Sequence, residues 1–266
     1  MRFSIIIVTL NAGERLKETV DSTLSQKCKD YEILIKDGGS KDDSLLFLDE
    51  PGSIYEENKD KIRVVNTKDK SIYDAMNQAV KYAKGDYYIF MNTGDLFEND
   101  KVLSAVTRLI LSENVDIVYG DMRRKGLNTL IPYPSRLTDF GCFRNIPCHQ
   151  VCFYKHSLFE KGGYDLKYRV RADYEHFLWC IYEYKATYKH IDIPVCIYEG
   201  SGYSETDENV FESKKEHKEI TKKYIGNKSG IFRLIMLLTL QPLRKRMSES
   251  KKLSGVYQKI KKLIYR

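Results

Sequence analysis

The sequence lacks any long hydrophobic run. Its longest apolar segment, IFRLIMLLTL, contains Arg233 and is well short of the roughly 18 to 20 apolar residues that a membrane-spanning helix needs. The apolar run near the N-terminus is also short, and no small-residue cleavage site follows it. We therefore expect a core strand there rather than a secretory signal, and no membrane-spanning segment elsewhere.

The sequence also lacks a Cys-x-x-Cys pair. Its six cysteines lie at positions 28, 142, 148, 152, 180 and 196, which predicts buried, reduced thiols in a cytoplasmic protein. Cys148, His149 and Cys152 could suggest zinc, but no second ligand pair lies at a suitable spacing. Zinc is therefore the weaker interpretation of these three residues.

The composition is that of a globular chain with a basic appendage. A chain of 266 residues, with 42% hydrophobic and 30% charged residues, can bury one large core. Residues 231–266 hold ten Lys or Arg and one acid, a charge of +9, so the rest of the chain carries −2 of the net +7. We predict a main domain over 1–225 and a basic tail over 226–266.

The first half of the chain alternates apolar runs with helical patterns. FSIIIVTL, YEILIKD, KIRVVN, DYYIFMN and DIVYGDM each predict a strand. Asn11 with Glu14 predicts a capping box, Ser40 with Asp43 predicts a second helix start, and Gly85 is expected to end the helix SIYDAMNQAVKYAKG. Strand and helix repetition of this kind predicts a parallel, three-layer α/β sheet.

The second half is looser after residue 121. HQVCFY and KHIDIPVCIY predict strands, RADYEHFLWCIYEY predicts a helix, and EGSGYS predicts a loop. In open α/β sheets, ligands bind beyond the carboxyl ends of the strands. The residues at three such ends are polar, acidic or glycine, which predicts one binding crevice; they are Thr9, Asn11, Asp37, Gly38, Gly39 and the run Asn92 to Asp95.

Taken together, these segments resemble the family 2 glycosyltransferases. The pieces that carry the resemblance are SIIIVTLNAGERLKETVDSTLSQ, YEILIKDGGSKDDS, DKSIYDAMNQAVKYAKGDYYIFMNTGDLF, HQVCFY and RADYEHFLW, over about residues 3 to 205. The resemblance implies a GT-A fold, which is a Rossmann-like α/β/α arrangement with a mostly parallel sheet. It also implies a nucleotide-sugar-binding half over 1–120 and an acceptor-side half over 121–225.

The resemblance implies an activity as well. It points to inverting transfer of a hexosyl or N-acetylhexosaminyl group from a nucleotide-sugar, usually a UDP-sugar, to a glycan hydroxyl. The sequence looks closest to bacterial members that build O-antigen, capsule or exopolysaccharide, where the acceptor is carried on a polyprenyl diphosphate. Donor sugar, acceptor and linkage have no sequence code.

Donor-side roles are carried over position by position. The resemblance places the nucleoside at Thr9 and Asn11, and a hydrogen bond from uracil at Asp37, because an ionised carboxylate only accepts. Gly38 and Gly39 would let the backbone approach the nucleotide. The other positions implied on this side are Asp74, Asn77, Asn92 and Gly94.

Asp95 matches the metal-binding position of the DxD-type motif, and Mg²⁺ and Mn²⁺ both suit its oxygen atoms. Asn92 and Gly94 stand where other members carry acids. A lone carboxylate predicts weak binding of the metal until the diphosphate of the donor supplies further ligands.

Acceptor-side roles follow from two motifs. Asp173 in RADYEHFLW matches the catalytic base, which must touch the acceptor hydroxyl. The alternatives are that Asp173 only caps a helix, and that Glu175 or His176 is the base. His149 and Gln150 match a pair that lines the acceptor side.

The tail carries a second signal. Residues 253–264 place apolar side chains at helical spacing with lysines on the other face, which predicts a helix lying on anionic lipid. The protein would then be cytoplasmic and peripherally bound to the inner face of the plasma membrane. The alternative is a helix packed on the domain. Nucleic-acid binding is not expected, because the tail has no interleaved stacking aromatics.

Two other functions stay open from the sequence. A sugar nucleotidyltransferase shares the nucleotide-binding sheet but needs a Gly-rich, Arg-containing loop after the first strand, and TLNAGERLKE is not such a loop. A non-catalytic nucleotide-sugar-binding protein is compatible with the incomplete DxD motif.

Overall fold

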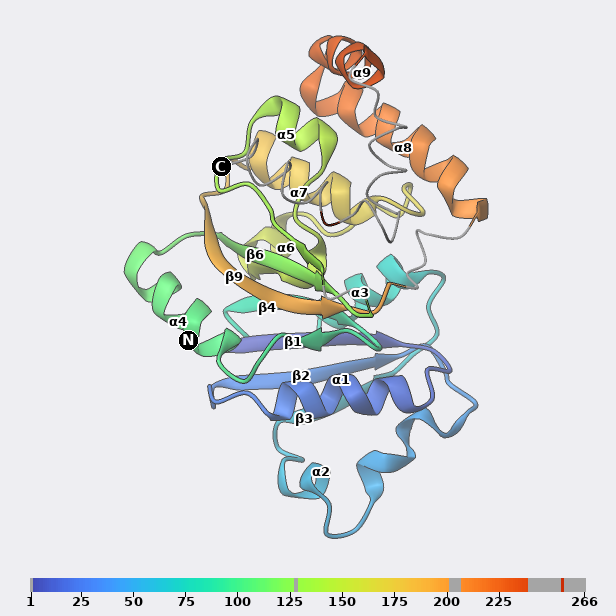
Figure 1. Ribbon diagram of the computed structural model, residues 1–266. Coiled ribbons are helices and arrows are strands. Elements are labelled where there is room, and N and C mark those ends of the chain that lie inside the picture. Colours follow the sequence, from blue (N-terminus) through green and yellow to red (C-terminus); the bar gives the residue numbers. More distant parts are fainter. Residues whose placement is uncertain (1, 127–128, 201–206, 239–254, 256–266) are drawn as a thin grey trace.

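The core of the molecule is a single sheet of nine strands (Figure 1). The structure is a computed structural model that describes residues 2–126, 129–200, 207–238 and 255. Its strands are β1 (Phe3–Thr9), β2 (Tyr31–Asp37), β3 (Ile62–Asn66), β4 (Tyr87–Asn92), β5 (Leu96–Phe97), β6 (Ile117–Arg124), β7 (Thr129–Ile131), β8 (Cys152–Lys155) and β9 (Tyr188–Tyr198). Their order across the sheet is β3-β2-β1-β4-β8-β6-β9-β5, and β7 pairs with β6.

The first four strands of this order form the parallel sheet that the sequence predicts. β1 pairs in parallel with β2 and with β4, and β2 pairs in parallel with β3. Every residue of β1 and β2 is buried, as expected for strands covered on both faces. The register sets Thr9 beside Asp37 and Val8 beside Asn92, so the strand ends meet at one edge.

Beyond β4 the sheet is mixed. β8 runs antiparallel to both β4 and β6, whereas β6 and β9 are parallel. The strand–helix repeat that predicted parallel pairing stops after α4 (Val102–Glu113), because β8 enters the sheet between β4 and β6 from the opposite direction. This change of direction brings the chain around 149–151 to the ends of the parallel strands.

Helices cover the sheet in two groups (Figure 1). Helices α5, α7, α8 and α9 gather beyond β6 and β9, and α1 and α2 lie with β1 to β3 at the other side. The remaining bounds are α1 (Glu14–Leu24), η1 (Asp43–Asp49), α2 (Ile54–Glu57), α3 (Ile72–Val80), α5 (Asp139–Arg144), η2 (His149–Val151), α6 (Ser157–Lys161), α7 (Ala172–Tyr182), α8 (Asp207–Ile225) and α9 (Lys228–Leu238).

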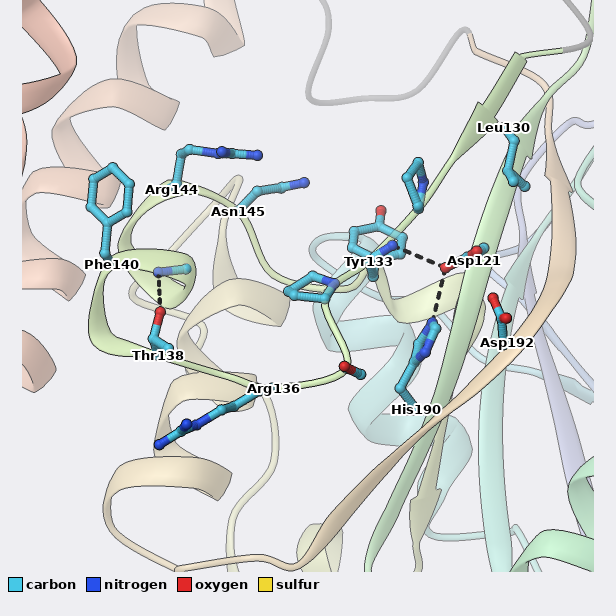
Figure 2. Close-up of a pocket in the computed structure, with 14 residues that line it drawn as sticks. Asp121, Leu130, Tyr133, Arg136, Thr138, Phe140, Arg144, Asn145, His190 and Asp192 are labelled. Atoms are coloured by element: carbon cyan, nitrogen blue, oxygen red, sulfur yellow. Dashed lines mark hydrogen bonds and ion pairs between the residues drawn. The ribbon is translucent and has the colours of Figure 1, made fainter. Parts of the chain in front are cut away.

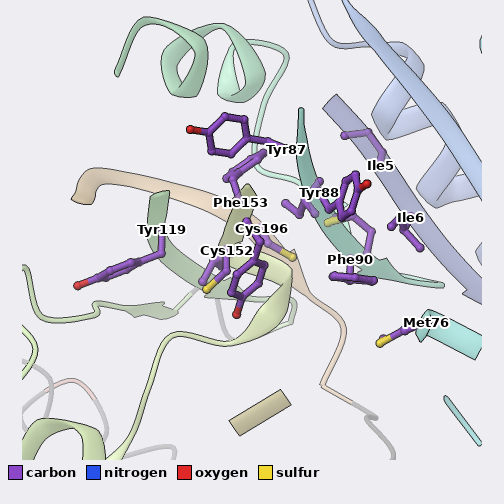
Figure 3. Close-up of a cluster of buried hydrophobic side chains, with 14 of the residues drawn as sticks. Ile5, Ile6, Met76, Tyr87, Tyr88, Phe90, Tyr119, Cys152, Phe153 and Cys196 are labelled. Atoms are coloured by element: carbon purple, nitrogen blue, oxygen red, sulfur yellow. The ribbon is translucent and has the colours of Figure 1, made fainter. Parts of the chain in front are cut away.

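The hydrophobic core is continuous between the two halves of the sheet (Figure 3). The ring of Phe3 on β1 lies 5.5 Å from the ring of Phe153 on β8 in an edge-on contact. Phe90 on β4 lies 5.2 Å from Phe159 on α6. The predicted nucleotide-side and acceptor-side halves therefore share one core, because their aromatic residues interdigitate.

Three predicted helix ends are wrong. α1 begins at Glu14 behind Gly13, and Asn11 instead accepts a hydrogen bond from the Lys41 amide at 2.8 Å. The N-cap of the second helical segment is Asp42, since Ser40 turns toward Asp37.

The third of these ends is that of α3, which stops at Val80, well before Gly85. A side chain at position 85 would meet the Ser4 backbone nitrogen at 2.5 Å. Gly85 is therefore needed for its close approach to β1.

The C-terminal helices pack on the acceptor-side half. The predicted boundary at 225/226 falls in the turn between α8 and α9. Phe232 on α9 lies 5.2 Å from Phe140 and 5.6 Å from Phe143 on α5. In the part of the chain that the structure describes, no helix is long and apolar enough to cross a membrane. The predicted lipid-binding stretch 253–264 lies outside the described residues apart from position 255.

Candidate active site

The loop after β2 is shaped by a buried carboxylate. Asp37 accepts hydrogen bonds from the amides of Gly39 at 3.1 Å and Ser40 at 3.0 Å, and from the Ser40 hydroxyl at 2.6 Å. Gly39 has φ of +97°, a conformation that favours glycine. Asn11 joins the end of β1 to this loop. The structure thus brings Asn11, Asp37, Gly38 and Gly39 together, with both Asp37 oxygens turned into the loop.

Two polar atoms at the same edge are buried without a hydrogen-bond partner among the described residues. They are Thr9 Oγ1 on β1 and Asn92 Oδ1 on β4. β1 and β4 are neighbours, but Asn92 pairs with Val8, so the side chains of Thr9 and Asn92 leave the carboxyl edge of the sheet on opposite faces. Because leaving a buried polar atom unpaired is costly, each atom is a candidate contact for a bound ligand.

A buried lysine supports the loop, and the sequence analysis missed it. Lys36 Nζ lies 2.8 Å from Asp69 Oδ2, 2.5 Å from the Thr67 carbonyl and 3.1 Å from the Asp37 carbonyl. A side chain at Gly38 would meet the same Asp69 oxygen at 2.8 Å. A lysine inside the buried strand YEILIKD is the signal that could have pointed to this ion pair.

Asp95 ends a tight turn after β4. Its amide donates to the Asn92 carbonyl at 3.0 Å, and Gly94 between them has φ of +95°. The buried carboxylate of Asp95 accepts from the Glu199 amide at 3.0 Å and from Gln150 Nε2 at 3.1 Å. Burial raises the pKa of Asp95, and these two hydrogen bonds oppose that rise without cancelling it.

A second carboxylate faces this turn. The Glu199 side chain lies where any side chain at Gly94 would collide with it, and Arg15 lies 3.5 Å from it. The sequence analysis missed Glu199 and described Asp95 as a lone acid. The available signal was its position directly after the strand KHIDIPVCIY.

These oxygen atoms fit a divalent cation. The Asp95 carboxylate and the unpaired Asn92 Oδ1 are hard ligands, with Glu199 beside them. Within the described ranges, no group of three His, Cys, Asp or Glu side chains is arranged to hold a metal, which leaves Cys148, His149 and Cys152 without a zinc geometry. A cation here would need oxygen atoms from a bound ligand or water to complete its coordination.

Asp173 stands in the first turn of α7 and is held from two sides. Its Oδ2 lies 3.1 Å from His149 Nδ1, and its Oδ1 accepts from the Tyr73 hydroxyl at 2.9 Å. Burial disfavours the charged carboxylate, but the hydrogen bonds from His149, Tyr73 and the Tyr174 amide oppose burial, and the pKa of Asp173 is held below its usual value. Arg171 occupies the N-cap position of α7 without a capping bond, and Asp173 Oδ1 also accepts from the Tyr174 amide at 2.9 Å.

His149 connects Asp173 to the end of β4. The strand predicted over HQVCFY begins only at Cys152, and 149–151 form the turn η2 instead. From this turn His149 Nε2 lies 3.3 Å from Asn92 Nδ2. The network assigns the proton to Nδ1, which donates to Asp173 while Nε2 accepts from Asn92. In that arrangement Asn92 Oδ1 points away from His149 and has no partner among the described residues.

A cavity of about 380 Å³ brings these groups together. Its wall includes Tyr73, Asn92, His149, Gln150 and Asp173. Residues from β4, α3, η2 and α7 therefore converge on one space, and of the residues predicted to form the crevice only Asn92 lines it.

Four residues that the sequence analysis considered for the site do not line this cavity. Glu175 is buried against α8, where it pairs with Lys223 at 2.8 Å and with the Tyr224 hydroxyl. His176 stacks on Phe159 in the core, and burial lowers its pKa to about 4. These contacts do not support either residue as the base.

The other two residues are structural in this arrangement. Asp74 accepts from the Lys70 amide at 2.8 Å and so closes the turn before α3. The Asn77 amide pairs with both the amide and the carbonyl of Tyr164, each at 2.8 Å.

The start of α7 is anchored by a residue that sequence reasoning missed. The buried Glu216 of α8 accepts from the backbone amides of Arg169 at 2.7 Å, Val170 at 3.1 Å and Arg171 at 2.8 Å. A carboxylate here satisfies amides that a helix start leaves unpaired and complements the helix dipole. No local pattern links position 216 to this loop.

Comparison with protein families gives one match over most of the chain. The sequence model of the family described as "Glycosyl transferase family 2" matches residues 4–204. A "PGL/p-HBAD biosynthesis glycosyltransferase" of Mycobacterium bovis is 34% identical over 208 residues, which are 77% of this chain and 79% of that protein. An "uncharacterized glycosyltransferase" of Mycobacterium tuberculosis is 34% identical over 66% of this chain and 67% of its own.

Solved structures share the fold. Staphylococcus aureus TarS 1–349 in complex with UDP superposes with a TM-score of 0.66 at 16% identity, over 85% of this chain and 66% of that one. The mannosyltransferase PcManGT of Pyrobaculum calidifontis, in complex with GDP-Man and Mn²⁺, gives a TM-score of 0.61 at 13% identity, over 97% and 83%. At these identities the likeness concerns the arrangement of the chain alone.

Proposed function

This chain belongs to glycosyl transferase family 2, with the GT-A fold expected from its sequence, and we propose that it is an inverting enzyme that uses a UDP-sugar. It moves the sugar to a hydroxyl of a glycan acceptor during the synthesis of a bacterial surface polysaccharide. One observation carries the proposal: a restrained carboxylate, Asp173, shares a cavity with Asn92 at the end of β4.

Asp173 is the proposed base. Its lowered pKa keeps it ionised near neutral pH, so it can accept the proton of the attacking hydroxyl. His149 and Tyr73 occupy one side of each carboxylate oxygen and fix its direction. The acceptor oxygen then attacks the anomeric carbon from the side opposite the departing diphosphate, which inverts that carbon.

The donor lies at the ends of β1, β2 and β4. Thr9 Oγ1 is a free buried group for the nucleoside, and the loop ordered by Asp37 offers Gly38 and Gly39 as points of close backbone approach. We assign the nucleoside to this loop as a unit, since both Asp37 oxygens already accept hydrogen bonds within it. The TarS structure in complex with UDP supports UDP as the nucleotide.

Asp95 and Asn92 are the proposed holders of Mn²⁺ or Mg²⁺, with Glu199 close by. A cation bound there would neutralise charge on the diphosphate leaving group. The Mn²⁺ present in the PcManGT complex supports this assignment. Gln150, which donates to Asp95, keeps the carboxylate directed toward the turn.

The proposed acceptor is lipid-linked, and the proposed location is the inner face of the plasma membrane. α9 exposes an apolar stripe in which Ile231 is 60%, Leu234 is 56% and Leu238 is 71% exposed. Residues three or four apart share one face of a helix, so these side chains form a continuous surface. The basic charge beyond α9 suits anionic headgroups.

The test is sugar transfer by the full chain. Purified protein with Mn²⁺ is offered UDP-glucose, UDP-galactose, UDP-N-acetylglucosamine and UDP-N-acetylgalactosamine with a synthetic polyprenyl-diphosphate sugar, and UDP release and product mass are followed. We expect transfer from one donor and a loss of 10²- to 10⁴-fold in Asp173→Asn. Asp60→Asn, at an exposed acid in the turn before β3, is the control and should change turnover less than about threefold. Loss of under tenfold in Asp173→Asn would remove Asp173 from its role.

A further inference from the structure

A second cavity lies beside the catalytic one and is larger. Its volume is about 680 Å³, and it is bounded by β6, β7, the segment 132–138, α5 and β9 (Figure 2). Tyr133 and Asn145 line both cavities. The two cavities therefore adjoin at Tyr133 and Asn145, which places the second cavity next to the one that holds Asp173.

Hydrogen bonds hold the segment 132–138, which lines the second cavity, on β6 and β9. Asp121 on β6 accepts from the Tyr133 amide at 2.9 Å and pairs with His190 Nε2 at 2.9 Å (Figure 2). The Tyr119 hydroxyl donates to the Pro134 carbonyl at 2.6 Å. Asp121 and His190 have side chains only 5% and 10% exposed. These hydrogen bonds fix the segment 132–138 on β6, so the cavity is preformed.

Several hydrogen-bonding groups around this cavity have no side-chain partner among the residues that the structure describes. They are the exposed side chains of Arg136, Asn145 and Asp192. Figure 2 shows Asn145 extending from the end of α5 toward the side where Tyr133 and Asp121 lie. Unlike Thr9 and Asn92 these groups are in contact with solvent, so they can meet a ligand at little cost.

The chemistry of the wall selects the kind of ligand. Carboxylate, amide and guanidinium groups together match a moiety with both hydroxyl donors and acceptors. The partly buried Phe140 supplies ring surface, on which the apolar face of a sugar packs. A hydrocarbon chain would leave the charged groups desolvated, and Arg136 and Arg144 balance Asp121 and Asp192, so the lining favours neither sign of ligand charge.

We propose that this cavity is an acceptor subsite, which binds the sugar residue next to the one that carries the reacting hydroxyl. The inference rests on the proposed function and extends it, because it predicts an acceptor of at least two sugars. Its volume, within the range of small-molecule sites, suits one or two pyranose rings. Arg136, Asn145 and Asp192 are its proposed specificity residues.

The test measures binding before catalysis. Full-length protein saturated with UDP is titrated with octyl monosaccharides and octyl disaccharides of glucose, galactose, rhamnose and N-acetylglucosamine, followed by saturation-transfer NMR. Ser135→Trp fills the cavity and Asp192→Ala removes a hydrogen-bonding group. Asp60→Ala, an exposed acid in a turn on the far side of β3, is the matched control.

We expect at least one disaccharide to bind about tenfold more tightly than its monosaccharide, and both cavity variants to remove that difference. UDP binding and the affinity for monosaccharides should stay within about twofold in every variant. Disaccharide binding that is equal in wild type and both cavity variants, or no disaccharide binding at all, would overturn the subsite. If the wild-type protein does not bind UDP, that result would instead count against the proposed function.

Discussion

Asp173 Oδ2 lies 3.1 Å from Nδ1 of His149, and the other nitrogen of the same ring lies 3.3 Å from the side-chain amide of Asn92. One imidazole thus connects the start of α7 to the end of β4. The proposed base and the proposed metal-binding turn are therefore fixed relative to each other. His149 acts through Asp173 and is a positioning residue.

Replacing His149 should move the pH profile of the enzyme. His149 helps to hold the pKa of Asp173 below its ordinary value, so the carboxylate stays ionised to low pH. In His149→Phe that support is lost and the pKa of Asp173 rises. The acidic limb of kcat/KM should move to higher pH, with activity lost earlier as the pH falls. A loss of activity that is uniform across pH would show that His149 has only a packing role.

Metal binding should depend on the nucleotide. Asp95 and Asn92 supply few ligands, so Mn²⁺ alone is expected to bind weakly, and UDP should tighten it at least tenfold. Isothermal titration with and without UDP measures this coupling. Asp95→Asn should remove it, whereas Asp116→Asn, at the opposite end of the sheet, should not. Tight Mn²⁺ binding to the nucleotide-free protein would contradict the assignment.

Glu216→Gln should slow catalysis without weakening the binding of UDP. The substitution puts an amide NH₂ where three backbone amides of 169–171 need an acceptor, so the first turn of α7 loses its anchor. We expect kcat to fall about tenfold with the donor KM unchanged, because a small displacement of the base is costly. Glu212→Gln, at a partly exposed residue of the same helix, is the control. Equal losses in both variants would argue against a specific anchor.

Stability should fall as the pH drops below that at which free histidine titrates. His176 is buried, and its pKa in the folded protein is about 4, against about 6.5 in the unfolded chain. Between these values only the unfolded state takes up the proton, so the free energy of unfolding falls by up to about 3 kcal/mol. His176→Gln keeps a donor for the Gly162 carbonyl and should flatten this decline in urea unfolding curves. An unchanged slope would mean that another group dominates.

The apolar stripe of α9 should carry membrane binding. Leu234→Glu places a charge in the middle of the stripe and should reduce binding to vesicles of phosphatidylserine and phosphatidylcholine about tenfold. Leu111→Glu on α4, where the leucine is 72% exposed, is the matched control. Vesicle binding that responds to neither change would leave α9 without this role.

The main elements of the fold could be predicted because their signals are local. Strands covered on both faces need mainly apolar runs, and β1 and β4 have them, whereas β2 also buries Glu32 and Lys36. Helix ends were harder to predict. The predicted capping box at Asn11 failed because the Asn11 side chain bonds to the Lys41 amide across the loop instead. A side chain that has two possible partners is assigned by packing, which propensity does not describe.

The candidate site was predictable only in part. Asp37, Asn92 and Asp95 stand at strand ends, and parallel pairing carries such ends to one edge. Asp74 and Asn77 lie on the expected helix but face the protein, since one turn of a helix decides which side chains reach the crevice. Glu175 is two positions from Asp173 and faces α8 for the same reason.

The sequence by itself determined the α/β arrangement, because hydrophobic periodicity is a short-range property of the chain, and its motifs carried the resemblance to the family 2 glycosyltransferases. Only the tertiary structure decided which groups act together. Asp173 meets His149 from 24 residues away, and Asp95 meets the Glu199 amide across 104 residues. Such contacts depend on how strands and helices pack against one another, and no local stretch of sequence contains that information.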